Sequence, residues 1–164
     1  MGNPVRNVVG KYGQGHPWVI IGAHFDSRLV ADQDPVGANR TTPVPGANAG
    51  ASGVGVLLEL ARTLPMHMSE ETYAKQVWLV FFDAEDNGNI GNRDWILGSQ
   101  AFVQSIDGER KPDAAIIVDM IGDSDQQIYF EQSSDPSINQ EIWGVAAELG
   151  YQNRFIPQTG RSIL

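Results

Sequence analysis

The stretch Gln76–Phe82 (QVWLVFF) constrains the fold most, because it is of strand length and carries apolar or aromatic side chains on both faces. Such a continuous apolar run is typical of a strand that is covered on both sides. Trp18–His24 (WVIIGAH) also has the character of a strand, and Ala114–Val118 (AAIIV) predicts a second fully buried one. Because amphipathic helical stretches separate these runs, the sequence predicts an α/β domain with a largely parallel sheet.

The segments around these runs add further elements. Val8–Tyr12 is predicted to pair with Trp18–His24 as a hairpin, because the residues between them are rich in turn formers. Ser52 is expected to cap a helix that runs to about Leu64, where Pro65 stops it, and Ser137 to cap a helix that runs to Leu149. Other expected elements are a helix over Ile96–Ile106, a strand over Gln127–Phe130 and a long irregular segment over Leu29–Asn48.

Composition narrows the classes of function. The 164 residues predict a single domain, and 11 Lys and Arg against 20 Asp and Glu give a net charge of −9, which disfavours a nucleic-acid partner. The absence of cysteine excludes disulfides, thiolate zinc sites and thiol nucleophiles. No run approaches the roughly 20 apolar residues of a membrane span, and no signal peptide follows Met1, so no membrane partner is expected.

Polar side chains follow three of the predicted strands directly. His24 and Asp26 follow the first, Glu85 and Asp86 the second, and Asp119 the third. In open α/β sheets, ligands bind outside the carboxyl ends of the strands, so these side chains are expected to meet at one edge. Converging carboxylates need a neutralising cation. With histidine present and cysteine absent, zinc is the first candidate, and magnesium or manganese is less favoured.

The residue types also suggest which chemical role each side chain would have at such a site. Asp26 is placed to accept the second ring N–H of a metal-bound His24. Of Glu85 and Asp86, one can bind the metal while the other accepts a proton from water. Trp95 either lines a substrate pocket or packs against the next helix. By contrast, His16 has no acidic neighbour in sequence and is expected to be solvated.

Five motifs follow one another along the chain: GAHFDS, PGANAGASG, FFDAED, GSQAF and DMIGD. Their succession resembles the zinc-dependent exopeptidases of the bacterial leucyl aminopeptidase type and the related glutaminyl-peptide cyclotransferases. The resemblance implies a three-layer αβα sandwich with a mixed, mostly parallel sheet and two zinc ions bridged by a carboxylate and a water. By motif, His24 and Asp119 correspond to ligands of the first zinc, Asp26 to the partner of His24, Glu85 to the general base and Asp86 to a ligand of the second zinc.

The sequence departs from the family pattern in two places. Ala49 stands where the family has its bridging carboxylate, and the last ligand, a histidine beyond a segment resembling Thr159–Leu164, is missing. The helical region that usually precedes Val8 is also missing, so we expect a domain that is incomplete at both ends and truncated at the C-terminus. Because zinc sites normally have three or four protein ligands, we expect weak or partial zinc occupancy.

The predicted function is therefore that of a zinc-dependent peptide hydrolase of the aminopeptidase type, with activity impaired by Ala49 and the missing histidine. The alternatives are a catalytically inactive domain with the exopeptidase fold and a glutaminyl-peptide cyclotransferase-like acyltransferase. The expected partner is the N-terminus of a peptide substrate. A homo-oligomer formed through an uncovered sheet surface is a further possibility. The resemblance also implies an extracellular or periplasmic location.

Overall fold

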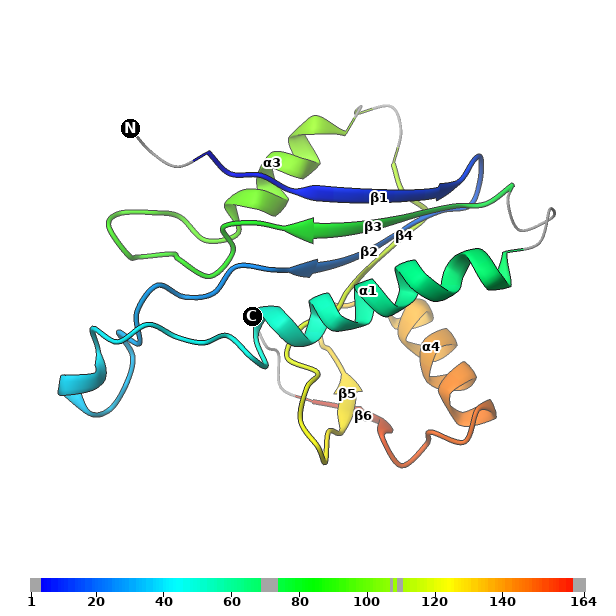
Figure 1. Cartoon of the computed structure of the whole chain (residues 1–164). Coiled ribbons are helices and arrows are strands. Elements are labelled where there is room, and N and C mark those ends of the chain that lie inside the picture. Colours follow the sequence, from blue (N-terminus) through cyan, green and yellow to red (C-terminus); the bar gives the residue numbers. More distant parts are fainter. Residues whose placement is uncertain (1–3, 69–73, 107, 109–110, 161–164) are drawn as a thin grey trace. The chain divides into compact units, whose positions relative to one another are not determined.

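A computed structural model describes residues 4–68, 74–106, 108 and 111–160 (Figure 1). The chain divides into two compact units, Met1–Gly122 and Asp123–Leu164, and each is described by itself. The first unit contains the long helix α1 and a four-stranded sheet, and the second contains α4 and a two-stranded sheet. None of the helices in the described ranges combines the length and the apolar character that a bilayer crossing requires.

The sheet of the first unit has the strand order β1-β3-β2-β4. Strand β3 pairs in parallel with β2 and antiparallel with β1, and β4 pairs in parallel with β2, so the sheet is mixed, as predicted. The predicted hairpin is wrong, because β3 lies between β1 and β2. Strand β3, which has the most continuous apolar sequence, therefore has a paired strand on each edge. The strands are β1 (Val8–Gly13), β2 (Trp18–His24), β3 (Gln76–Phe82) and β4 (Ala114–Ile117).

Helices cover both faces of this sheet, which gives the αβα layers that the sequence resemblance implies (Figure 1). On one face, Trp18 and Ile20 pack with Val80, Phe82 and Phe102, the last from α3 (Leu97–Ser105). On the other face, α1 (Gly50–His67) packs against β2 and contributes the fully buried Leu57.

Strand β4 is less buried than its sequence predicts. It forms an edge of the sheet, and its residues alternate between partly buried and exposed, with Ile117 57% exposed. An edge strand has a sheet neighbour on one side only, which leaves more of its side-chain surface accessible to solvent. The prediction of a second fully buried strand is therefore wrong for this unit.

Helix α1 begins earlier and ends later than predicted. Ala49 is the N-cap residue, Ser52 lies inside the helix, and Pro65 does not end it, since the helix continues to His67. A proline inside a helix has no N–H for the carbonyl oxygen four residues earlier. Here the hydroxyl group of Tyr12 donates to that oxygen, at 3.1 Å on Ala61, so the lost hydrogen bond is replaced by one from β1.

The second unit is built around an aromatic cluster. Trp143 of α4 (Pro136–Glu148) contacts Phe130 of β5 (Ile128–Phe130) and Phe155 of β6 (Phe155–Thr159). The Trp143 indole also donates to the main-chain oxygen of Ile156. Asp135, not Ser137, caps α4, because its carboxylate accepts the first free main-chain N–H groups. Of the segment Thr159–Leu164, residues 161–164 lie outside the described ranges.

Candidate metal centre

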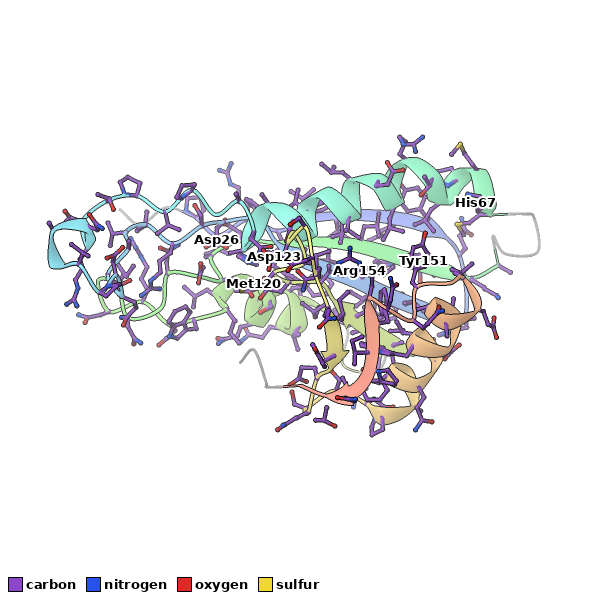
Figure 2. The ribbon with its side chains drawn as sticks, turned by 90° about the horizontal axis from the view of Figure 1, so that it is seen from below. Asp26, His67, Met120, Asp123, Tyr151 and Arg154 are labelled. Atoms are coloured by element: carbon purple, nitrogen blue, oxygen red, sulfur yellow. The ribbon has the colours of Figure 1, made fainter. Side chains whose placement is uncertain are left out.

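The register of the sheet explains why distant polar residues meet. His24 lies opposite Phe82 and Gly22 lies opposite Ile117, so β2, β3 and β4 end at the same edge. Figure 2 shows Asp26 and Met120, which follow β2 and β4, near the end of the sheet where α1 begins. His67 lies at the opposite end of α1 (Figure 2).

His24 is the centre of this group. Its side chain is only 4% exposed and lies between two carboxylates, with Nε2 3.4 Å from Asp119 Oδ1 and Nδ1 3.5 Å from Asp26 Oδ1. The close approach of the Asp119 carboxylate, and then of the Asp26 carboxylate, raises the pKa of His24 to about 10, against the opposing effect of burial. Without a metal, the ring is therefore protonated at neutral pH, and a metal ion must displace that proton.

Asp26 is held in place by the loop that follows β3. Its carboxylate accepts the main-chain N–H of Glu85 at 2.9 Å, the main-chain N–H of Asp86 at 3.2 Å and the amide of Asn87 at 3.1 Å. Burial opposes ionisation of Asp26, but His24 and the two main-chain N–H groups together keep its pKa below the usual value. The same carboxylate thus orients His24 and fixes the segment that carries the two other acidic groups.

Glu85 and Asp86 have a different electrostatic environment from Asp26. Burial raises the pKa of Glu85, and the negative charges of Asp119 and Asp26 add to the effect. Burial also raises the pKa of Asp86. A carboxyl group whose pKa lies above its usual value is better suited to accept a proton from a reacting group.

The start of α1 forms one side of the site. A Cβ at Gly50 would lie 2.5 Å from the main-chain oxygen of Asp26 and 3.4 Å from Cε1 of His24, so the helix backbone packs directly on this segment. Ser52 Oγ and Asn48 Oδ1 accept the main-chain N–H groups of Ile121 and Gly122, which fixes the segment after Asp119. Ala49, between them in sequence, offers a methyl group where the resemblance expects a carboxylate.

The side chains of His24 and Asp119 fit part of a zinc site. Two ligands at zinc-ligand distances of about 2.0–2.2 Å in tetrahedral geometry lie about 3.4 Å apart, which matches the separation of Nε2 and Oδ1. Asp119 Oδ1, which faces Nε2, and His24 Nδ1, which faces Asp26, are buried and make no hydrogen bond of ordinary geometry with the residues that the structure describes. However, within the described ranges no group of three or more His, Asp or Glu side chains has the spacing of a complete metal site.

Sequence reasoning missed two residues at this edge. Asn87 connects loops, because its amide donates to Asp26 while its Oδ1 accepts the main-chain N–H of Leu29. Arg28 contacts the same loop through main-chain oxygens. The only signal in the sequence was their position directly beside the acidic motifs. In addition, His16 has the acidic neighbour that was not expected, with Nδ1 3.3 Å from Asp113 Oδ2.

Comparisons with known proteins identify chains with a similar fold. The chain is 37% identical to a glutaminyl cyclase from Porphyromonas gingivalis, with a TM-score of 0.84 over 98% of this chain and 57% of that one. It is 31% identical to a Zn-dependent exopeptidase from Parabacteroides distasonis, with a TM-score of 0.86 and the same coverage. It is also 35% identical over 122 residues to the uncharacterized protein YfbL of Escherichia coli, which is 74% of this chain and 34% of that protein.

The chain therefore spans about a third of that curated relative and just over half of these two solved structures. The family description "Peptidase family M28" matches residues 7–163. This match covers nearly the whole chain and confirms the resemblance found from the motifs. The chain belongs to peptidase family M28.

Proposed function

We propose that this chain is a zinc-dependent peptide hydrolase scaffold of the aminopeptidase type, which acts at the N-terminal residue of a peptide. The observation that carries the proposal is the 3.4 Å separation of His24 Nε2 and Asp119 Oδ1, with Asp26 behind the imidazole ring. That separation suits two ligands of one zinc ion, and Asp26 supplies the carboxylate that commonly accompanies a zinc-bound histidine.

Glu85 is the proposed general base. When bound, zinc supplies Lewis-acid polarisation of the scissile carbonyl and makes a nearby water more acidic. Glu85 accepts the proton of the attacking water and returns it to the amine that leaves. Its buried environment, which raises its pKa, supports both halves of that proton transfer. Asp26 keeps the His24 ring oriented throughout and holds the main-chain N–H groups of Glu85 and Asp86.

The proposed activity is low, because few side chains are available to bind zinc. His24 and Asp119 provide two ligands, and Asp86 is the remaining acidic candidate near them. Ala49 contributes none. Two protein ligands, rather than three or four, favour weak and exchangeable zinc binding.

Hydrolysis of aminoacyl-anilides, measured while zinc is added to the purified chain, tests this proposal. We expect slow hydrolysis that increases with zinc and is lost in Glu85→Gln, while zinc binding by that variant is unchanged. Elemental analysis gives the zinc content of the same samples. Hydrolysis that is indifferent to zinc, or equal in Glu85→Gln, would contradict the proposal. A chain without activity and with well under one equivalent of zinc supports the alternative of an inactive domain.

A second candidate is the glutaminyl-peptide cyclotransferase reaction, because the P. gingivalis protein with 37% identity is a glutaminyl cyclase. In this reaction, the N-terminal amine of the substrate attacks its own side-chain amide carbon, and ammonia leaves. Release of ammonia from a peptide that begins with glutamine distinguishes the two candidates, since aminoacyl-anilides without glutamine cannot undergo this cyclisation.

A further inference from the structure

Arg28 connects the long irregular segment after β2 to the loop after β3. Its side chain is only 12% exposed, and it binds Asp32 through two hydrogen bonds, Nε to Oδ1 at 2.5 Å and Nη2 to Oδ2 at 2.7 Å. The remaining donors reach main-chain oxygens, with Nη1 2.6 Å from Asp86 O and Nη2 3.3 Å from Gly88 O. One planar guanidinium group thus contacts three residues of two loops.

The same guanidinium group also contacts an aromatic ring. Arg28 Cζ lies 4.9 Å from the ring centroid of Trp95, within the range of a cation–π interaction. A Cβ at Gly88 would overlap Cδ2 of this indole, so the ring occupies space that only glycine leaves free. Trp95 is therefore packed closely against both Gly88 and Arg28.

The loop that holds Trp95 closes on the proposed general base. The main-chain N–H of Ile96 donates to the oxygen of Glu85 at 3.1 Å, and that of Leu97 donates to the oxygen of Ala84 at 3.1 Å. These bonds join the two ends of the loop. A displacement of Trp95 or of Asp86 O would therefore be transmitted to the main chain of Glu85.

We propose that Arg28, fixed by Asp32, is a positioning residue that holds the Glu85–Trp95 loop in place beside the candidate metal centre through Asp86 O, Gly88 O and the Trp95 ring. This inference rests on the proposed function in one respect: the position of Glu85 affects catalysis only if Glu85 is the general base. Arg28 acts through the main chain of the loop, and Asp26 acts on the same segment from the other side through the N–H groups of Glu85 and Asp86.

Hydrogen exchange of the intact 164-residue chain tests the positioning role without requiring activity. We expect Arg28→Met to speed exchange of the Glu85 and Asp86 amides by at least about tenfold, because a charge-assisted network is lost. Exchange in β3, at Leu79 and Val80, should change by less than about twofold. Arg28→Lys keeps the charge but loses the planar fork, so we expect a smaller effect of about threefold to fivefold.

The chain offers a matched control. Arg62 binds Glu59 with the same two-bond geometry, Nε to Oε2 at 2.9 Å and Nη2 to Oε1 at 2.5 Å, on the exposed surface of α1. Arg62→Met should leave exchange at Glu85 and Asp86 unchanged. Equal acceleration in both methionine variants, or equal acceleration in β3 and in the loop, would mean general destabilisation and would overturn the inference.

Zinc binding gives the second measurement. By competition with a coloured chelator, we expect Arg28→Met to weaken zinc binding at least about threefold and Arg62→Met to leave it unchanged. If the unmodified chain binds no zinc, the proposed function fails, while the exchange result still decides the role of Arg28. If loop exchange is unchanged in Arg28→Met, the positioning role is wrong even if zinc binds to the unmodified chain.

Discussion

Strand β2 carries a histidine–aspartate pair at each of its ends, and the two pairs differ mainly in burial. Before the strand, His16 Nδ1 lies 3.3 Å from Asp113 Oδ2, with side chains 66% and 50% exposed. At the other end, His24 Nε2 lies 3.4 Å from Asp119 Oδ1, and the imidazole is almost completely buried. The two separations are nearly equal, so distance alone does not distinguish the pairs.

Burial gives the two pairs different chemistry. Water screens the exposed pair, and such pairs contribute little to stability. Around His24, the low local dielectric strengthens the interactions with Asp119 and Asp26, and the pKa of the ring rises to about 10. Asp119 Oδ1, which faces Nε2 of this ring, is buried without a hydrogen bond of ordinary geometry to any described residue, so it can accept an additional partner. We therefore expect metal binding to respond to changes at one end of β2 only.

Removing the imidazoles should give the largest contrast. We expect His24→Gln to weaken zinc binding by about a hundredfold or more, since it removes one of the two proposed protein ligands. His16→Gln should leave zinc binding unchanged. Calorimetric titration with zinc measures both variants. Equal losses of zinc affinity in the two variants would show that the two ends of β2 do not differ as proposed.

Changing the carboxylate behind the buried ring should have the next largest effect. We expect Asp26→Asn to weaken zinc binding about 10-fold to 100-fold, because the amide holds neither the ring nor the main-chain N–H groups as a carboxylate does. Asp113→Asn is the matched change at the exposed pair and should have no effect on zinc. Circular dichroism of both variants checks that they fold. Unchanged affinity in Asp26→Asn would refute the orienting role.

The pH dependence of zinc binding sharpens the comparison further. The pKa of His24 in the metal-free chain is raised to about 10, so at lower pH zinc must displace a proton. We expect the affinity to increase by up to about tenfold per pH unit from about pH 6 to about pH 8. Chelator competition at several pH values measures the slope. An affinity that is independent of pH would contradict a protonated His24.

Substitution of Asp113 in the exposed pair should have the smallest effect, and the effect should be on the stability of the fold. The main-chain N–H of Trp18, at 2.6 Å, and then His16 lower the pKa of Asp113. A lowered pKa stabilises the fold above the unfolded value of 3.8, and this contribution is lost as pH falls through the folded value. Asp113→Asn should therefore lower the urea midpoint slightly at neutral pH and lose that difference in acid. A large drop at neutral pH would show that this pair is more than a surface contact.

Local sequence patterns predicted the strands well but not their neighbours. The apolar runs of β2 and β3 predicted strands with the observed bounds, because strand character depends on the residues themselves. The pairing of β1 with β3 depends on which edge of the sheet is free, which no turn sequence encodes. Likewise, the continuation of α1 through Pro65 depends on a hydroxyl group from Tyr12. Tertiary contacts of this kind override local signals.

As with the fold, only part of the candidate site could be predicted from the sequence. The rule that parallel strands end at one edge anticipated the meeting of His24, Asp26 and Asp119, and their roles as ligands or partners stay predictions. Arg28 and Trp95 could not be paired from sequence, because the stacking of a guanidinium group on an indole across two loops leaves no periodic pattern. The burial that separates His24 from His16 is also a property of the folded chain.

The close contact of α1 with the strand end has a consequence for protein engineering. If position 50 were randomised, any side chain would collide with the main-chain oxygen of Asp26 and push the helix away from His24, so a selection for zinc binding should return glycine alone. At Gly55 of the same helix, an added Cβ would have no atom of the described residues outside its own helix backbone and chain neighbours within 4 Å. Alanine there should raise stability by about 0.5–1 kcal/mol. Position 50 of α1 therefore tolerates only glycine, whereas position 55, little more than one turn away, tolerates a side chain.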